Sequence, residues 1–223
     1  MLKKIPLYVW ISMIIIVICQ CSTYYITQLL NTNRTFYDLT IHAIDDKVPF
    51  ISFFIVFYVL AYPFWILTPF ILIKLPKKDY FNWLISGIIL YILFFIIYLI
   101  IPTTISRPNV DNNNIFDWLT NLIYMMDSPQ RPTSLFPSFH CELSIMCYLG
   151  VAFNKLFPRW YRIFSFVFMI LICLSTQFIK QHYIVDLVSA ISLTLIVYLT
   201  VKKLNLSKFI IKEEKRVNDN QGV

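Results

Sequence analysis

The stretch Leu174–Ser189, LSTQFIKQHYIVDLVS, places ionisable side chains at the start of a strongly apolar segment. Lys180, His182 and Asp186 all fall within seven residues. Each ionisable group at the centre of a membrane helix costs about 2.5 to 3.5 kcal/mol on insertion scales, so this clustering needs a reason. His182 and Asp186 are four residues apart and would share one face of a helix, where the carboxylate accepts a hydrogen bond from one imidazole nitrogen. The other nitrogen is then directed outward, which predicts a nucleophile or base.

The composition is that of an integral membrane protein. The 223 residues are 58% hydrophobic with only three glycines, and the mean hydropathy of +0.68 is far above that of soluble domains. The net charge of +7 does not indicate a nucleic-acid partner, because the basic residues form short clusters between apolar segments. The five cysteines lie in or beside apolar segments without zinc-ligand spacing, so we expect no metal site and no cofactor.

Six apolar segments are long enough to cross a hydrocarbon core of about 30 Å at about 1.5 Å per residue. They cover residues 6–29, 50–73, 82–101, 137–157, 161–179 and 182–201. We therefore predict an all-α fold, a six-helix membrane bundle at residues 1–206, followed by a polar cytoplasmic tail at residues 207–223. Pro63 and Pro69 should kink the second segment.

The basic residues also predict the orientation of the bundle. With the N-terminus in the cytoplasm, fourteen of the nineteen Lys and Arg residues lie on the cytoplasmic side. The five on the other side are Arg34, Lys47, Arg107, Arg131 and Lys180. By the positive-inside rule, both termini are cytoplasmic and the long loop at 102–136 lies outside. A lean toward Ile, Asn and Lys is typical of AT-rich bacterial genomes, which predicts a multi-pass protein of a bacterial plasma membrane.

Three polar clusters fall on the predicted outer face. They are IPTTISRP with Arg107, SLFPSFHCELS with Ser138 and His140, and the 174–189 stretch with Lys180 and His182. Two histidines, a carboxylate and cations at one water-facing edge suit phosphoryl transfer. The two cations would bind phosphate oxygens, one imidazole would attack phosphorus, and the other would protonate the leaving oxygen.

These motifs resemble those of the type 2 phosphatidic acid phosphatase superfamily, whose fold is shared with vanadium haloperoxidases. Its signature is Lys, six residues, Arg-Pro; then Pro-Ser-Gly-His; then Ser-Arg, five residues, His, three residues, Asp. Here the first part is reduced to Arg107 and Pro108, the second reads Pro137–His140, and the third reads Ser175–Asp186. The resemblance covers the chain from the second segment to the sixth.

Three positions depart from that signature. Ile100 replaces the first Lys, Phe139 replaces the Gly, and Thr176 replaces the Arg of the third part. The FPSFH form followed by KQHYIVD is similar to the branch that contains inositol phosphorylceramide synthases. Because two phosphate-binding cations are missing from their usual places, we expect Lys180 to compensate, with Arg131 as the weaker candidate.

The resemblance implies a role for each matching residue. His182 would attack the phosphoryl group and become a phosphohistidine, while Asp186 orients it. His140 would protonate the departing oxygen. Arg107 and the backbone around Ser138 would bind phosphate oxygens, and no metal ion would be required.

The sequence therefore predicts a membrane enzyme that hydrolyses a phosphomonoester or pyrophosphate of a lipid. Phosphatidic acid, phosphatidylglycerol phosphate and undecaprenyl pyrophosphate all stay open as substrates, and nothing indicates an oligomeric state. One alternative is a phosphotransferase that passes the phosphoryl group or phospho-headgroup to an alcohol. Another is a degenerate member that binds phosphate without turnover. A proton-relay transporter should show an inverted repeat and broken helices, and neither is visible.

Two other polar residues have less specific patterns. Glu142 follows His140 by two residues at a depth where a carboxylate is costly, so it either tunes His140 or binds a neighbouring helix. His42 has no partner at motif spacing, and we expect it to be a polar loop residue.

Overall fold

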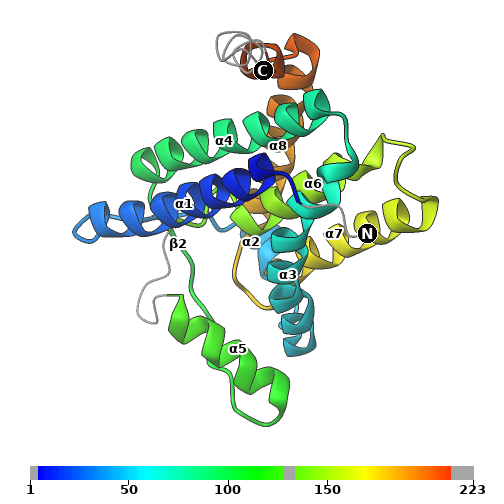
Figure 1. Cartoon of the computed structure of the whole chain (residues 1–223). Helices are drawn as coiled ribbons and strands as arrows, with labels where there is room; N and C mark the ends of the chain where they lie inside the picture. Colours follow the sequence, from blue (N-terminus) through cyan, green and yellow to red (C-terminus); the bar gives the residue numbers. More distant parts are fainter. Residues whose placement is uncertain (1–4, 128–133, 212–223) are drawn as a thin grey trace, which may run out of the picture.

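The computed structural model of the chain describes residues 5–127 and 134–211, and its regular structure is mainly helical (Figure 1). The α-helices are α1 (Leu7–Leu30), α2 (His42–Asp45), α3 (Ile55–Ile71), α4 (Lys77–Ile100), α5 (Ile115–Met126), α6 (Phe139–Ala152), α7 (Arg159–Phe178) and α8 (Ile184–Leu204). The 3-10 helices η1 (Ser52–Phe54) and η2 (Leu72–Lys74) extend α3 at its two ends. The two-residue strands β1 (Tyr37–Asp38) and β2 (Thr103–Thr104) pair in parallel, with Tyr37 opposite Thr103.

Five helical stretches of the described chain are long and apolar enough to cross a membrane, namely α1, the stretch Ser52–Lys74, α4, α7 and α8. The predicted all-α membrane bundle is thereby confirmed. The remaining apolar helix, α6, has 14 residues and is about 21 Å long at the α-helical rise. Six crossings and two cytoplasmic termini stay predictions.

The predicted fourth segment, residues 137–157, is wrong at its C-terminal end, because α6 stops at Ala152. Asn154 explains the stop. Its side-chain oxygen accepts a hydrogen bond from the Leu156 N–H at 2.9 Å, and its carbonyl accepts one from the Phe157 N–H at 3.3 Å. Such local bonds offer the backbone a turn in place of another helical turn.

The predicted third segment, residues 82–101, begins too late, because α4 starts at Lys77. Asn82, which marks the expected boundary, is instead buried inside α4. Its side-chain oxygen accepts a hydrogen bond from the Ser207 N–H at 2.9 Å, and its amide group donates to Asn205 Oδ1 at 3.3 Å. Asn205 adopts a left-handed φ of 52° and ends α8. Asn82 therefore joins the start of α4 to the end of α8.

The central helix of the bundle is α6. Eleven of its 14 residues are buried, and it packs against α3, α4, α7 and α8. Two indole groups fasten it to its neighbours. Trp65 of α3 donates to Ser144 Oγ at 3.0 Å, and Trp83 of α4 donates to the Met146 carbonyl at 2.9 Å. The helix that carries His140 in its first turn is thus held on several sides.

The expected loop at residues 102–136 contains a helix, α5, that the sequence analysis did not predict. Its N-cap is Asn114, whose Oδ1 accepts hydrogen bonds from the N–H groups of Phe116 and Asp117. In Figure 1, α5 projects from the other helices, and it packs against η1 and α3. Its exposed apolar residues are Ile115, Trp118, Leu122, Met125 and Met126. One apolar face at helical spacing is typical of a helix at a membrane interface.

Both Pro63 and Pro69 lie inside α3, which continues past them.

The close approach of α6 to η2 gives a stability test. A Cβ built at Gly150 would lie 2.7 Å from a methyl carbon of the buried Leu72, whereas a Cβ at Gly87 of α4 meets nothing within 4 Å. Both glycines are helical, so alanine brings each a similar gain in helix propensity of up to about 1 kcal/mol. We expect Gly150→Ala to lower the apparent melting temperature in detergent, because overpacking costs about 1 to 3 kcal/mol. Gly87→Ala should leave it unchanged or raise it, and equal shifts in the two variants would contradict this packing.

Candidate active site

The turn between α7 and α8 positions His182 through its backbone. The carbonyl of Thr176 accepts hydrogen bonds from the N–H groups of Gln181, at 2.9 Å, and His182, at 3.1 Å. Lys180 has a φ of 52°, in the left-handed region that allows the chain to reverse here. Thr176 occupies the place of an arginine in the signature described above, and its side chain is fully buried. Its contribution is therefore structural, through its carbonyl.

His182 and Asp186 are paired as the spacing predicts. His182 Nδ1 lies 3.2 Å from Asp186 Oδ2, and the same oxygen accepts the Tyr183 N–H at 3.0 Å. Both side chains are buried. Since a carboxylate only accepts hydrogen bonds, Nδ1 is the protonated nitrogen, and Nε2 is left with a lone pair. The pair thus presents an imidazole that can act as a nucleophile or a base.

His140, on the first turn of α6, faces the same region from a different helix. Its ring stacks on Tyr58 with 4.0 Å between the centroids and meets the edge of Trp65 at 4.9 Å. Its Nε2 is buried and has no hydrogen-bond partner among the residues that the structure describes. The ring centroids of His140 and His182 are 6.3 Å apart. This separation leaves room for one phosphoryl group that contacts both imidazoles.

Both histidines line a cavity of about 420 Å³, a volume within the range of small-molecule sites. Its polar lining also includes Gln20, Tyr24, Tyr25, Tyr58, Asp127 and Gln181. These residues come from α1, from α3 and from the segments that flank α5 and α8. The cavity is therefore formed by elements from both halves of the chain.

Ser138 joins the first turns of α6 and α8. Its N–H donates to the Asp186 carbonyl at 3.2 Å, and its Oγ accepts the Cys141 N–H at 3.4 Å. Ser138 is fully buried, and both groups already have partners. The N–H groups of Phe139 and His140 have none in the described part of the chain. Any phosphate contact from this backbone therefore falls to these two residues.

Arg107 lies beside the cavity and is held in one position. Its guanidinium donates to the Tyr124 carbonyl at 3.2 Å, to the Asp127 carbonyl at 3.3 Å, and to the side chains of Asp127 and Gln181. It also lies over the Tyr124 ring, 4.6 Å from the centroid. Arg107 is not itself among the residues that line the cavity, but its side-chain partners Asp127 and Gln181 both are, so its positive charge lies at the edge of the cavity.

Lys180 is directed away from this cavity. Its Nζ donates to the Asp45 carbonyl at 3.0 Å, and it is not among the residues that line the cavity. Asp45, to which the sequence analysis gave no role, anchors the whole turn. Its carboxylate accepts the Ile184 N–H at 2.9 Å and the Ile41 N–H at 2.7 Å. The other candidate cation, Arg131, lies outside the described residues.

Two further positions lie outside the site. One is Ile100, which stands where the signature has a lysine, and the other is His42. Ile100, in place of the signature lysine, is 63% exposed at the end of α4. His42 pairs with Asp46, with 3.2 Å between Nδ1 and Oδ2, and its side chain is 80% exposed. His42 is therefore a polar surface residue, but the prediction of a loop residue without a partner is wrong, because His42 begins α2 and pairs with Asp46 at the same spacing as His182 and Asp186.

Asp127 is a candidate site residue that no motif indicated. Its carboxylate lines the cavity and accepts hydrogen bonds from Arg107 and from Tyr24 of α1. Burial raises the pKa of this carboxyl to about 7, and a protonated His182 imidazole would act in the opposite direction. Its proton can therefore be gained or lost near neutral pH.

The family model described as PAP2 superfamily matches residues 36–200. This range contains both histidines, Asp186, Arg107 and Asp127. No curated protein and no solved structure matched the chain.

The Asp127 carboxyl gives a prediction for pH dependence. Below about pH 7 it is neutral, and the Arg107 charge is available to a phosphate; above that pH the carboxylate neutralises Arg107 and repels the phosphate. We expect the KM for a phosphate monoester to rise between about pH 6 and pH 8, and to rise less in Asp127→Asn. Asp46→Asn, which removes an exposed carboxylate, is the control. Identical profiles in all three proteins would show that Asp127 does not affect phosphate binding.

Proposed function

The chain belongs to the PAP2 superfamily, and we propose that it hydrolyses a phosphomonoester or pyrophosphate of a lipid through a phosphohistidine intermediate. Membership indicates a phosphatase or phosphotransferase acting on phosphate esters. The apolar helices make it a multi-pass membrane protein, which suits a lipid substrate. The observation that carries the proposal is that His182, whose Nδ1 is paired with Asp186, shares one cavity with His140 at 6.3 Å between the imidazole centroids.

In the first step, Nε2 of His182 attacks phosphorus while the bond from phosphorus to the lipid oxygen breaks. Asp186 stabilises the imidazolium that forms, because its carboxylate accepts the hydrogen bond from Nδ1. His140 gives a proton to the departing oxygen. In the second step, His140 takes a proton from water, and the hydroxide oxygen displaces the imidazole from phosphorus. Inorganic phosphate leaves, and His182 is restored.

The phosphate charge is balanced by protein groups, and we propose that the reaction needs no metal ion. Arg107 brings a guanidinium to the edge of the cavity through Gln181. The N–H groups of Phe139 and His140 open α6, where the helix dipole favours an anion. Positive charge placed in advance around the developing charge is a large contribution to catalysis in many enzymes.

We place the site on the extracytoplasmic face of a bacterial plasma membrane. The histidines lie at one end of the bundle. Lys77, at the start of α4, and Lys202, in the last turn of α8, lie at the other end. The clustering of basic residues at that opposite end favours a cytoplasmic location for it. A lipid phosphate would then enter sideways from the outer leaflet.

The second candidate is transfer of the phosphoryl group or headgroup to an alcohol. It is favoured by Phe139, which replaces the motif glycine and resembles the form found in inositol phosphorylceramide synthases. Phe139 packs against three aromatic rings of α4, those of Tyr91, Phe94 and Tyr98. In this version the alcohol replaces water in the second step.

Phosphate release by purified protein in detergent with EDTA tests the proposal. Phosphatidic acid, phosphatidylglycerol phosphate and undecaprenyl pyrophosphate are compared, each with and without an added alcohol. We expect His182→Ala to lower the rate at least about 10³-fold, since the nucleophile is lost. His42→Ala removes an exposed histidine and should keep wild-type activity. Consumption of the lipid phosphate only with an alcohol, with a phosphorylated alcohol as the product in place of inorganic phosphate, would establish the transferase. No turnover under either condition would contradict both candidates.

A further inference from the structure

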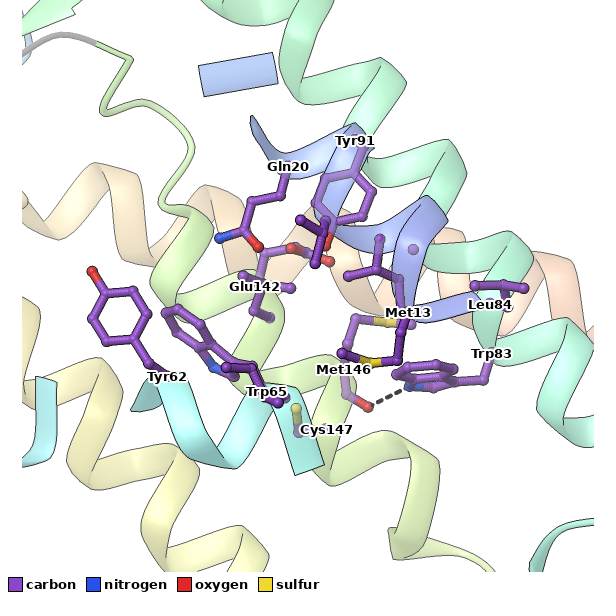
Figure 2. A pocket seen from close by; sticks show the side chains of 15 residues that line it. Met13, Gln20, Tyr62, Trp65, Trp83, Leu84, Tyr91, Glu142, Met146 and Cys147 are labelled. Atoms are coloured by element: carbon purple, nitrogen blue, oxygen red, sulfur yellow. Dashed lines mark hydrogen bonds between the residues drawn. The ribbon is translucent and has the colours of Figure 1, made fainter. Parts of the chain in front are cut away.

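A second cavity, of about 160 Å³, is shown in Figure 2. It adjoins the cavity that contains the two histidines, with which it shares lining residues. Gln20 and Tyr62 line both cavities. Helices α1, α3, α4 and α6 surround it. Its lining is mainly apolar, with side chains such as Met13, Val17, Ile66, Leu84 and Met146. A narrow apolar space that continues from a polar reaction site suits a ligand with one charged end and one hydrocarbon part.

Glu142 is the exceptional residue of this cavity. Its side chain is buried, and neither carboxyl oxygen has a hydrogen-bond partner among the described residues. The indole N–H groups of Trp65 and Trp83, which also line the cavity, donate to Ser144 and Met146 instead. Buried polar groups are nearly always hydrogen-bonded, so an unpartnered one next to an empty space indicates a missing ligand.

The order of residues along two helices gives the direction of that ligand. Along α6, His140 lines the catalytic cavity, Glu142 follows, and Met146 lies further along the second cavity. Along α1, Tyr24 lines the catalytic cavity, and Met13 the second one. The second cavity therefore lies deeper in the bundle than the histidines. A lipid with its phosphate between the histidines would direct its chain past Glu142.

We propose that this cavity binds the carbonyl-linked start of an acyl chain, with the Glu142 carboxyl group in its neutral form donating a hydrogen bond to the carbonyl oxygen. This inference rests on the lipid phosphate function proposed above and selects a substrate class. An acyl lipid has a carbonyl a few bonds from its phosphate, whereas an isoprenyl phosphate has only hydrocarbon there. Acyl-linked phosphates are therefore the substrates, and isoprenyl phosphates leave Glu142 unpartnered.

Ester-linked and ether-linked phosphatidic acids of equal chain length test the hydrogen bond, because they differ only in the carbonyl. We expect wild-type kcat/KM to be about threefold to tenfold higher for the ester, the size of one hydrogen bond. Glu142→Leu should abolish this ratio, and Glu142→Gln, which keeps a donor, should retain it. A ratio near one in the wild type would overturn the inference. Hydrolysis of p-nitrophenyl phosphate, tested against His182→Ala, reports separately whether the proposed catalytic function holds.

Photo-crosslinking tests occupancy of the cavity without turnover. The probe is a phosphatidic acid with a diazirine in its acyl chain, bound to the His182→Ala protein. Adducts are expected on peptides of α1 and α6 that contain Met13 and Met146. Gly87 borders the cavity, and a Cβ built at this position would meet no other atom within 4 Å. Gly87→Leu should therefore fill the space and lower the crosslinking yield severalfold. Ile92→Phe, which adds bulk at a 57% exposed position of α4, is the control. Equal yields in both variants would overturn the inference.

Discussion

The hydrogen bonds of Asp186 join the first turns of two helices that are remote in the chain. Its side chain holds His182 at Nδ1, and its carbonyl accepts the Ser138 N–H that precedes α6. Because α6 and α8 are both packed into the bundle, this junction determines where His140 lies relative to His182. A displacement of about 1 Å in such an arrangement can cost about a hundredfold in rate. The relative positions of His140 and His182 in the candidate site therefore depend on both the carboxylate and the backbone carbonyl of Asp186.

The polar groups around the site fall into two kinds. Some have all the partners they need, such as the Asp45 carboxylate and the Thr176 carbonyl, and these hold the backbone in place. Others are buried without a partner among the described residues, including His140 Nε2, Gln181 Nε2 and the Glu142 carboxyl. In a low-dielectric interior such groups destabilise the empty protein. That they line the two adjoining cavities indicates that ligand binding compensates for the cost.

Periodicity and hydropathy were reliable where the signal is local and strong. The apolar stretches of α1, α7 and α8 were located to within a few residues, and the spacing of His182 and Asp186 was sufficient to predict their pairing. Helix α5 was missed because twelve residues with one apolar face fall below the length of a membrane span. The early stop of α6 depends on the turn at Asn154, a weaker signal than the apolar run around it.

The sequence by itself determined the membrane class of this protein, its family and the histidines of its candidate site, because composition and motif spacing are properties of neighbouring residues. Only the tertiary structure decided which distant polar groups meet. Lys180 bonds to Asp45, and Arg107 to Asp127 and Gln181, across loops whose paths no local pattern specifies. The surroundings of Glu142 were likewise decided by packing, since four helices must come together before a side chain in the first turn of α6 can face an unfilled space. Contacts of this kind depend on the shape of the whole core, which is why they could not be predicted from spacing alone.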